Sequence, residues 1–395
     1  MSSESTQDRV LRESDRSDLD SVVGVLAEHA AEVDRAARFP AESMDALRRA
    51  GYLGYLVPVA YGGMGGDLAG LVRTAKALAG GCLSTAMIWA MHCQQVEVLV
   101  RHANPRLLGD VLPRIADGEL YLASVTTGET SGGRLLSVDD PLRTAGTEVL
   151  LSRSAPVVTG GMHADAFLIT MRASAEAGRH SVSLVYAERS ALTIEPVGAW
   201  NTLGMRGTES GALRLIGTVR ADDVIGEPGR FRIIATETMI PVGHIGWSAC
   251  WLGAAHAAFR QLIGMLSRDS SRDLSSTLLR ERIARIRFEL ELVGTYLDRV
   301  RESVDEVWAG GQTLDVPRRQ IHLNTLKLAA SELTFRAVDR MIQLAGLAAG
   351  YSADSPLRLE RTFRDLRSAA LNYSNDQLWS ANGALALLDR NVGLL

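Results

Sequence analysis

The sequence has few cysteines, no long apolar run and little net charge, and each of these absences excludes a class of protein. Its three cysteines, Cys82, Cys93 and Cys250, lie inside apolar helical stretches and not in the paired spacing of metal ligands, so we expect buried thiols in a reducing cytoplasm and no bound metal. No run approaches the roughly 18 apolar residues of a membrane span, and the opening M-S-S-E-S-T-Q-D-R lacks the apolar core of a signal peptide. A net charge of −4 offers no basic surface to nucleic acid. We therefore expect a cytoplasmic protein without nucleic-acid or membrane partners.

The size and composition predict a globular protein with more than one packed unit. A chain of 395 residues exceeds the usual extent of a single hydrophobic core. Its 46% apolar and 22% charged residues are ordinary values for a soluble protein. Local patterns along the chain are helical, then β, then helical again, which predicts an α+β protein of two or three units.

The first unit, residues 1–118, is predicted to be all helical after a disordered start. Residues 1 to about 16 are polar and charged, and such chain ends are commonly disordered. Apolar residues then recur at three-to-four spacing over 18–33 and 40–50, and two further helices are expected within 71–99.

The second unit, residues 119–232, is predicted to be an antiparallel β domain. Its short segments are rich in β-branched residues and are separated by Gly, Asp and Pro. The expected strands are residues 119–126, 148–152, 166–171, 181–186 and 212–219.

The third unit, residues 233–395, is predicted to be a helical bundle. Apolar periodicity runs over 233–265, 275–308 and 316–348, and three helices of this length are typical of a bundle. Alternating Arg and Glu residues over 280–291 indicate a charged face that is solvated or meets another subunit.

A polar run interrupts the helical pattern near the C-terminus. A basic, amphipathic stretch, residues 361–367, is followed by Asn-Tyr-Ser-Asn-Asp at 372–376, which we call the knot, before apolar helix resumes at Leu378. Small polar side chains of this kind break helical periodicity and offer donors and acceptors. The knot is either an ordinary turn between helices or part of a site.

Several local motifs, in this order, resemble the acyl-CoA dehydrogenase superfamily of FAD flavoproteins. The motifs are Asp34 with Phe39-Pro40, A-G-Y-L-G-Y-L-V-P-V-A-Y-G-G-M-G-G at 50–66, L-P-R-I-A-D-G-E-L-Y at 112–121, L-G-M-R-G-T-E-S-G-A-L-R-L at 203–215, Q-L-A-G-L-A-A-G-Y at 343–351 and R-T-F-R-D-L-R at 361–367. The resemblance implies an N-terminal helical domain, a β domain that contacts the flavin and a C-terminal four-helix bundle. It also implies FAD bound between the domains of a homotetramer or homodimer, with a neighbouring subunit completing each site.

The resemblance places candidate cofactor contacts in the β domain and at the end of the bundle. Hydroxyls suit the polar atoms of the flavin ring and the pyrophosphate, and a guanidinium suits a diphosphate. Pro156-Val157-Val158 replaces the family's Trp-Ile-Thr, so Thr159 is the candidate for the contact to flavin N5. The full set of cofactor candidates is Thr126, Thr127, Ser131, Thr159, Arg268 or Arg272, Gln343 and Asn375.

The main departure from the family concerns the catalytic base. Dehydrogenation of an acyl thioester needs a carboxylate of raised pKa to take the α-proton. Tyr373 stands at the position of the usual glutamate, and Ser374-Asn375 replaces the Gly-Thr after it. A minority of the family carry the glutamate on the first bundle helix, where this chain has Gly243-His244. His244 and Asp376 remain as candidate bases.

A branch of the superfamily works without that glutamate. Its members are monooxygenases that receive reduced flavin, FMN or FAD, and hydroxylate nitrogen or carbon through a C4a-hydroperoxyflavin. They carry a helical histidine, a hydroxyl residue before Gly in the β domain and a histidine in the knot. This chain has His92, Thr159-Gly160 and Asn372 at these places. His92 is equally expected as a packing histidine bonded to the backbone.

Three functions therefore remain open. The first is oxidation of an acyl thioester, on CoA or an acyl carrier protein, in a specialised biosynthetic pathway, with electrons passing to an electron-transfer flavoprotein. The second is a flavin-dependent monooxygenase served by a flavin reductase. The third is a flavin-binding scaffold without activity. A carboxylate aimed at the flavin would favour the first, and an open polar pocket the second.

Overall fold

The fold is described from a computed structural model that covers residues 6–128 and 135–393, with side chains from residue 18 onward. Helix α1 begins at Thr6, whereas the sequence leads us to expect disorder up to about residue 16. The sequence there, Q-D-R-V-L-R-E-S-D-R, has three Arg, a residue that forms helices well, and polarity alone does not prevent a helix. Residues 1–5 lie outside the described part. Within the described part, no helix has both the length and the apolar character needed to cross a membrane.

Helices make up the N-terminal part of the chain. They are α1 (Thr6–Ala36), α2 (Ala41–Arg49), α3 (Leu68–Gly81), α4 (Leu83–His102) and α5 (Pro105–Ala116). The side chains of Asp67 and Asn104 cap α3 and α5 by accepting hydrogen bonds from backbone N–H groups of the first turn. Helix α4 is buried along almost its whole length, because it packs against α3, α7 and strand β1.

The described strands form two sheets of four strands each, where the sequence predicts one antiparallel domain. They are β1 (Leu122–Val125), β2 (Arg143–Ala145), β3 (Glu148–Ala155), β4 (Ala166–Arg172), β5 (Val182–Glu188), β6 (Leu192–Pro196), β7 (Leu213–Arg220) and β8 (Val224–Ile225). One sheet has the order β1-β4-β5-β8 and the other β2-β3-β7-β6. Strands β1 and β4 pair in parallel, and the other pairs are antiparallel.

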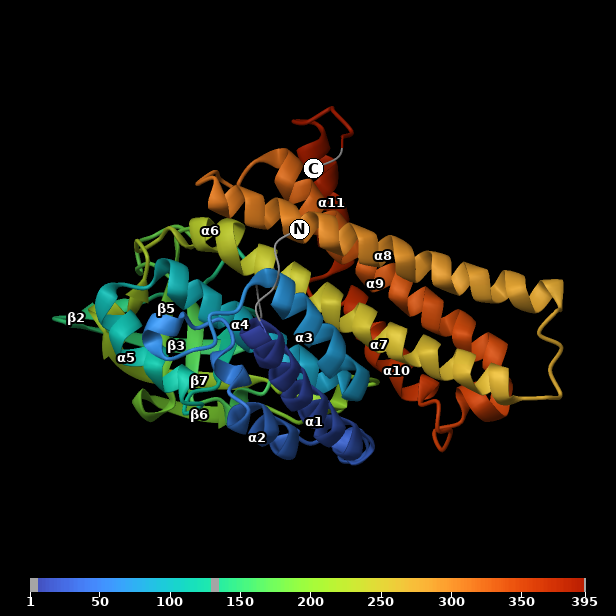
Figure 1. The fold of residues 1–395 in the computed structure, drawn as a ribbon. Coiled ribbons are helices and arrows are strands. Elements are labelled where there is room, and N and C mark those ends of the chain that lie inside the picture. The colour runs from blue at the N-terminus through green and yellow to red at the C-terminus, as the bar shows by residue number, and fades with distance from the viewer. Residues whose placement is uncertain (1–5, 129–134, 394–395) are drawn as a thin grey trace.

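The C-terminal part is a bundle of long helices that extends away from the sheets (Figure 1). Its helices are α6 (Phe231–Ile234), α7 (Ile240–Arg268), α8 (Thr277–Ala309), α9 (Pro317–Gly346), α10 (Leu359–Arg367) and α11 (Asn375–Ala386). The loop between α7 and α8 lies at the end of the bundle farthest from the sheets (Figure 1). The charged face of α8 is mostly exposed, but Glu289 is buried and pairs with Arg336 and Arg340 of α9.

One π-helical turn, Ala235–Met239, joins α6 to α7. Side chains from three other helices hold its carbonyl groups. Gln94 of α4 donates to the carbonyl of Met239, Trp308 of α8 to that of Glu237, and Gln320 of α9 to that of Thr236. Since π-turns within helices often occur at functional sites, this turn indicates that the start of α7 is part of a functional site.

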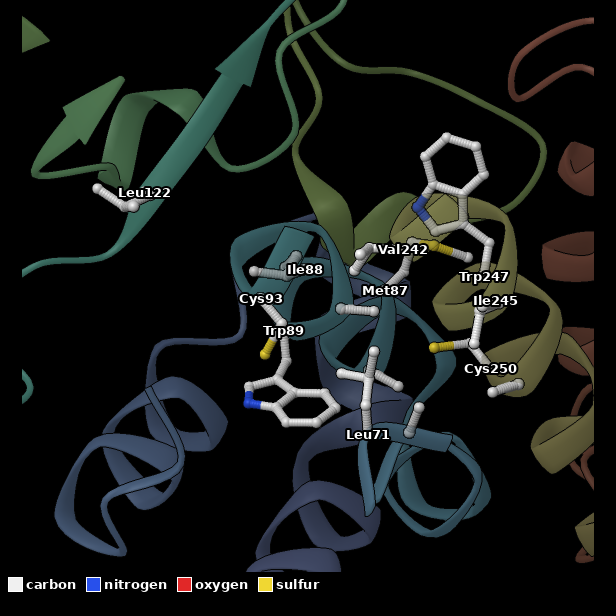
Figure 2. Close-up of a cluster of buried hydrophobic side chains, with 14 of the residues drawn as sticks. Leu71, Met87, Ile88, Trp89, Cys93, Leu122, Val242, Ile245, Trp247 and Cys250 are labelled. Carbon is white, nitrogen blue, oxygen red and sulfur yellow. The ribbon is translucent and has the colours of Figure 1, made fainter. Parts of the chain in front are cut away.

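The N-terminal helices and the bundle share one apolar core. Figure 2 shows it between α3, α4, α7 and β1, with Trp89 and Leu71 inside and Trp247 at its edge. Helices α3 and α7 lie so close that a Cβ on Gly253 would come 2.4 Å from the carbonyl oxygen of Lys76. The core therefore fixes α4 and α7 relative to the end of β1.

Candidate active site

Two neighbouring cavities lie where α4, the β strands, α7 and the knot meet. The first cavity has a volume of about 320 Å³ and the second about 360 Å³. They share a wall of residues, which are Met91, Val157, Thr159, Leu371 and Asn372. Together they are large enough for a flat ring system and a second small molecule.

The first cavity draws its lining from four parts of the chain. Strand β1 contributes Ala123 and Ser124, the chain after it Thr126 and Thr127, and α4 contributes Met91 and Gln94. The remaining described lining comes from other β-domain segments, from the start of α7 with the residue before it, and from the knot with its neighbours: Leu135, Val157, Thr159, Met239, Ile240, His244, Trp247, Leu371, Asn372, Tyr373, Ser374 and Gln377. None of these lining residues is Asp or Glu.

His244 lines the first cavity and has one ring nitrogen whose lone pair no described residue uses. Its Nδ1 donates a hydrogen bond to the carbonyl of Leu323 on α9, at 3.1 Å, which fixes the tautomer and leaves Nε2 as an acceptor. Nε2 is buried and has no partner among the described residues. Burial, with the nearby charge of Lys327, lowers the pKa of His244 to about 3, so the imidazole is neutral at physiological pH.

The knot presents a phenol to this histidine and no carboxylate. The Tyr373 ring lies edge-on to His244, with ring centres 5.5 Å apart, and Tyr373 has a positive φ of 51°. Burial raises the pKa of Tyr373 to about 12, so its hydroxyl stays protonated and acts as a donor. Asp376 is exposed on α11 and does not line either cavity. The structure therefore does not support Asp376 as a base.

His92 does not reach either cavity. Its side chain is fully buried, with Nε2 2.9 Å from the carbonyl of Leu53 and Nδ1 accepting from the N–H of Leu122 at 3.0 Å. Both ring nitrogens are therefore used by the backbone, and burial lowers the pKa of His92 to about 4. The geometry gives His92 the packing role, because no lone pair or proton is left for chemistry.

Three of the four β-domain cofactor candidates lie at the cavities. Thr126 and Thr127 line the first cavity and Thr159 lines both. The Thr127 hydroxyl donates to the carbonyl of Val157, and the Thr159 hydroxyl accepts from Ser210. Ser131 lies outside the described residues.

Arg268, Arg272 and Gln343 lie away from the cavities. The two arginines belong to the end of α7 and the following loop, and Gln343 to the end of α9. These ends meet at the far end of the bundle (Figure 1). Arg272 pairs with Asp269 at 3.2 Å, and Gln343 donates to Asp339 at 2.7 Å. Their own chain's cavities are thus out of their reach.

Asn375 faces α9 and not a cavity, although it was a cofactor candidate. Its side-chain oxygen accepts from Lys327 at 2.6 Å and from Ser331 at 3.2 Å, while its nitrogen donates to Ser331 and Glu332. Sequence reasoning missed Lys327, although lysine is rare in this chain and a rare residue inside an apolar helix is a signal.

Buried donors without partners surround the cavities. Among the described residues, the indole nitrogens of Trp247 and Trp251 and the amide nitrogen of Asn372 are buried and unpaired. Trp247 and Asn372 line the first cavity, and Trp251 and Asn372 line the second. Buried polar groups normally have partners, so these donors indicate an acceptor-bearing ligand between them.

Comparison with known proteins identifies the family. The family model described as acyl-CoA dehydrogenase, N-terminal domain, matches residues 12–119, and that described as acyl-CoA dehydrogenase, C-terminal domain, matches residues 233–371. The chain belongs to the acyl-CoA dehydrogenase family. Members of this family are flavin oxidoreductases. Probable acyl-CoA dehydrogenase FadE25 of Mycobacterium tuberculosis is 25% identical over 369 residues, covering 92% of this chain and 91% of the relative.

Solved structures of three functional kinds share the acyl-CoA dehydrogenase fold. Butyryl-CoA dehydrogenase from Megasphaera elsdenii has a TM-score of 0.84 at 19% identity, covering 98% of this chain and 100% of its own. FMN-bound TdsC from Paenibacillus sp. A11-2, a dibenzothiophene monooxygenase, has a TM-score of 0.84 at 18% identity, covering 96% and 98%. The prolyl acyl carrier protein oxidase AnaB has a TM-score of 0.81 at 18% identity, covering 98% and 99%.

The cavities suit a flavin of the kind this family uses. An isoalloxazine ring carries two carbonyl oxygens and ring nitrogens that accept hydrogen bonds, and the unpaired amide and indole N–H groups of Asn372, Trp247 and Trp251 are donors. Thr126, Thr127 and Thr159 add hydroxyls from the β side.

Proposed function

We propose that this protein oxidises an acyl thioester with a bound FAD, and that His244 takes the α-proton in place of the missing glutamate. The observation that carries the proposal is the unpaired Nε2 of His244 in the lining of the first cavity, in a fixed tautomer. The family membership and the acyl-CoA dehydrogenases among its relatives supply the substrate class.

Each residue then has a definite task. Nε2 of His244 accepts the α-proton and becomes an imidazolium whose Nδ1–H remains bonded to Leu323. A bound flavin would supply the acceptor for the hydride that leaves the β-carbon, so that the thioester would become α,β-unsaturated. An electron-transfer flavoprotein or oxygen would then take up the two electrons. The Tyr373 hydroxyl stays protonated and can donate to the thioester carbonyl, which acidifies the α-proton.

Reduction of bound flavin by substrate tests this proposal. Protein loaded with FAD is mixed without oxygen with saturated acyl thioesters of increasing length, on CoA and on a carrier protein, and loss of flavin absorbance is followed. We expect His244→Gln to slow this step at least a hundredfold with FAD still bound, because a general base contributes about 10²–10⁴-fold. Asp376→Asn is the matched control and should react like the wild type. Equal rates for wild type and His244→Gln would remove His244 as the base.

The lack of an acidic residue in the described lining of the first cavity favours a second candidate function. A monooxygenase needs no base for an α-proton, and neutral His244, Tyr373 and Asn372 make a polar pocket without charge. In this case the chemically reduced protein, FMN- or FAD-loaded, should react with oxygen through a transient absorbance band and should hydroxylate an added amine or aromatic compound. Slow reoxidation without a transient would exclude this candidate, and failure to take up any flavin would exclude both enzymatic candidates.

A further inference from the structure

Of the 42 basic Lys and Arg residues in this chain only two are lysines, and one of these is completely buried. Lys327 lies on α9, fully shielded from solvent, whereas Lys76 is partly exposed on α3. Burying an ammonium group is costly unless it is paired, and lysine adapts to burial by shifting its pKa. At this buried position the chain thus has a lysine, which can lose its proton, and not an arginine, which cannot.

Lys327 has polar and aromatic contacts but no ion pair among the described residues. Its Nζ donates to the Asn375 oxygen at 2.6 Å and lies 5.7 Å from the centre of a Trp251 ring. Glu332 is linked to Lys327 only through Asn375, whose side-chain nitrogen donates to the Glu332 carboxylate at 3.2 Å. Burial lowers the pKa of Lys327 to about 7, with Glu332 acting in the opposite direction.

His244, on α7, is hydrogen-bonded to the same region of α9. The carbonyl that accepts from His244 Nδ1 belongs to Leu323, four residues before Lys327, so the imidazole is bonded to α9 about one helical turn before the lysine. A charged amine there disfavours a second positive charge on the imidazole, which is the reason that Lys327 contributes to the low pKa of His244.

Several other ionisable groups on the elements packed against α9 are engaged elsewhere or stay uncharged. Tyr373 in the knot is protonated, and Asp376 on α11 is exposed. On α8, Glu289 pairs with Arg336 and Arg340; on α10, Arg364 pairs with Asp34, and Asp365 accepts from the N–H of Met205. Glu332 is thus the charge that reaches Lys327, through Asn375.

We propose that Lys327 is a positioning residue that decides when His244 can accept a proton and that, through Asn375, fixes the knot against α9. The role in proton transfer rests on the proposed function, and the coupling between the two side chains does not. Below about pH 7 the charged amine keeps the imidazole from taking a proton. Above it the amine is neutral, and Nε2 of His244 becomes a better acceptor for the substrate proton.

The coupling can be measured on the full-length protein without substrate. Lysine labelled with ¹³C and ¹⁵N at the side-chain end gives two side-chain NMR signals, and Lys76→Arg assigns them. We expect the Lys327 signal to titrate near pH 7, and at lower pH in Glu332→Gln. The His244 imidazole signal should shift over the same pH range as the Lys327 signal. That imidazole step should vanish in Lys327→Met, where Asn375 keeps the Ser331 bond. A Lys327 signal unchanged up to pH 9, or a His244 signal indifferent to it, would overturn the proposal.

The effect on the reaction is read from variants that fix the charge. Lys327→Arg stays charged and Lys327→Met stays neutral at every pH. Flavin reduction by the thioester should rise about tenfold from pH 6 to pH 8 in the wild type, since a group with a pKa near 7 is about one-tenth neutral at the first pH and nine-tenths at the second. The wild type should be close to Lys327→Met at pH 8 and should fall towards Lys327→Arg at pH 6. Parallel pH profiles in all three would contradict the positioning role, whereas absence of reduction in all three, with the NMR coupling intact, would count only against the thioester.

Discussion

At the scale of single residues, hydrogen-bond saturation separates the two buried histidines. His92 and His244 are both fully enclosed, but His92 uses both ring nitrogens on backbone groups and His244 uses one. The sequence predicts that either could be catalytic, since it shows their positions in helices but not the carbonyl and N–H groups that chain folding brings to them. The hydrogen bond between Asn375 and Lys327 could not be predicted from the sequence either, because the two residues are 48 positions apart.

His92 provides a residue-scale prediction. His92→Phe should lower the free energy of unfolding by about 2–5 kcal/mol, because a buried carbonyl of Leu53 and a buried N–H of Leu122 each lose their partner. Flavin reduction per folded molecule should be unchanged. Denaturant unfolding measures the stability, with the exposed His180→Gln as a control expected within about 0.5 kcal/mol of the wild type. A stable His92→Phe with lost activity would restore the catalytic role.

At the scale of elements, three of the sequence motifs meet at Arg364. This α10 residue pairs with Asp34 of α1 at 2.6 Å and donates to the carbonyl of Leu203 at 3.0 Å. Gly204 follows so closely that a Cβ on it would lie 2.0 Å from the Arg364 carbonyl oxygen. These contacts join α1, α10 and the loop that lines the second cavity, which explains why motifs distant in sequence occur together.

An element-scale prediction follows from this junction. Arg364→Gln should lower the free energy of unfolding by roughly 3 kcal/mol, because Asp34 keeps a mostly buried charge without its partner. Adding Asp34→Asn should recover part of that loss, as the double-mutant cycle in denaturant would show. Arg287→Gln, from an exposed i,i+4 pair, is the control and should change stability little. Strict additivity of the two changes at the junction would mean that the pair contributes nothing.

The strands show what periodicity can predict. The β3 segment alternates exposed and buried residues, and β4 is almost continuously buried, so both stand out in the sequence. The sequence missed β2, β6 and β8, because β2 and β6 have little burial pattern and β8 has two residues. The parallel pairing of β1 with β4 depends on contacts across 44 residues, which local patterns do not reveal.

At the scale of the whole molecule, buried histidines should make stability fall in acid. Burial lowers the pKa of His92 and His256 to about 4 and of His244 to about 3, below the usual 6.5, so the unfolded chain binds more protons between pH 6.5 and 4. The stabilisation is fully present above pH 6.5. Below pH 6.5, we expect each fully buried histidine to lower the free energy of unfolding by about 1.4 kcal/mol per pH unit.

Calorimetric or denaturant unfolding between pH 7 and 4.5 checks this expectation. Asp365 has the opposite effect on stability. Burial raises its pKa to about 6, so the folded state binds this proton more tightly than the unfolded chain, and stability from this group is lost as pH rises through about 6. The loss in acid should shrink in His92→Phe, relative to its own value at pH 7. Stability independent of pH in this range would contradict the buried, neutral histidines.

The π-helical turn before α7 has a consequence for the length of the chain. An α-helix turns by about 100° per residue, so the number of residues between α6 and His244 sets the direction in which that histidine points. Removing one residue from Ala235–Met239 would allow a regular α-helix there, yet it would rotate His244 away from Leu323 and the whole of α7 out of phase with α4 and α9. The protein thus depends at this point on a count of residues, and a deletion that makes the helix more regular would disable the site without changing any side chain in it.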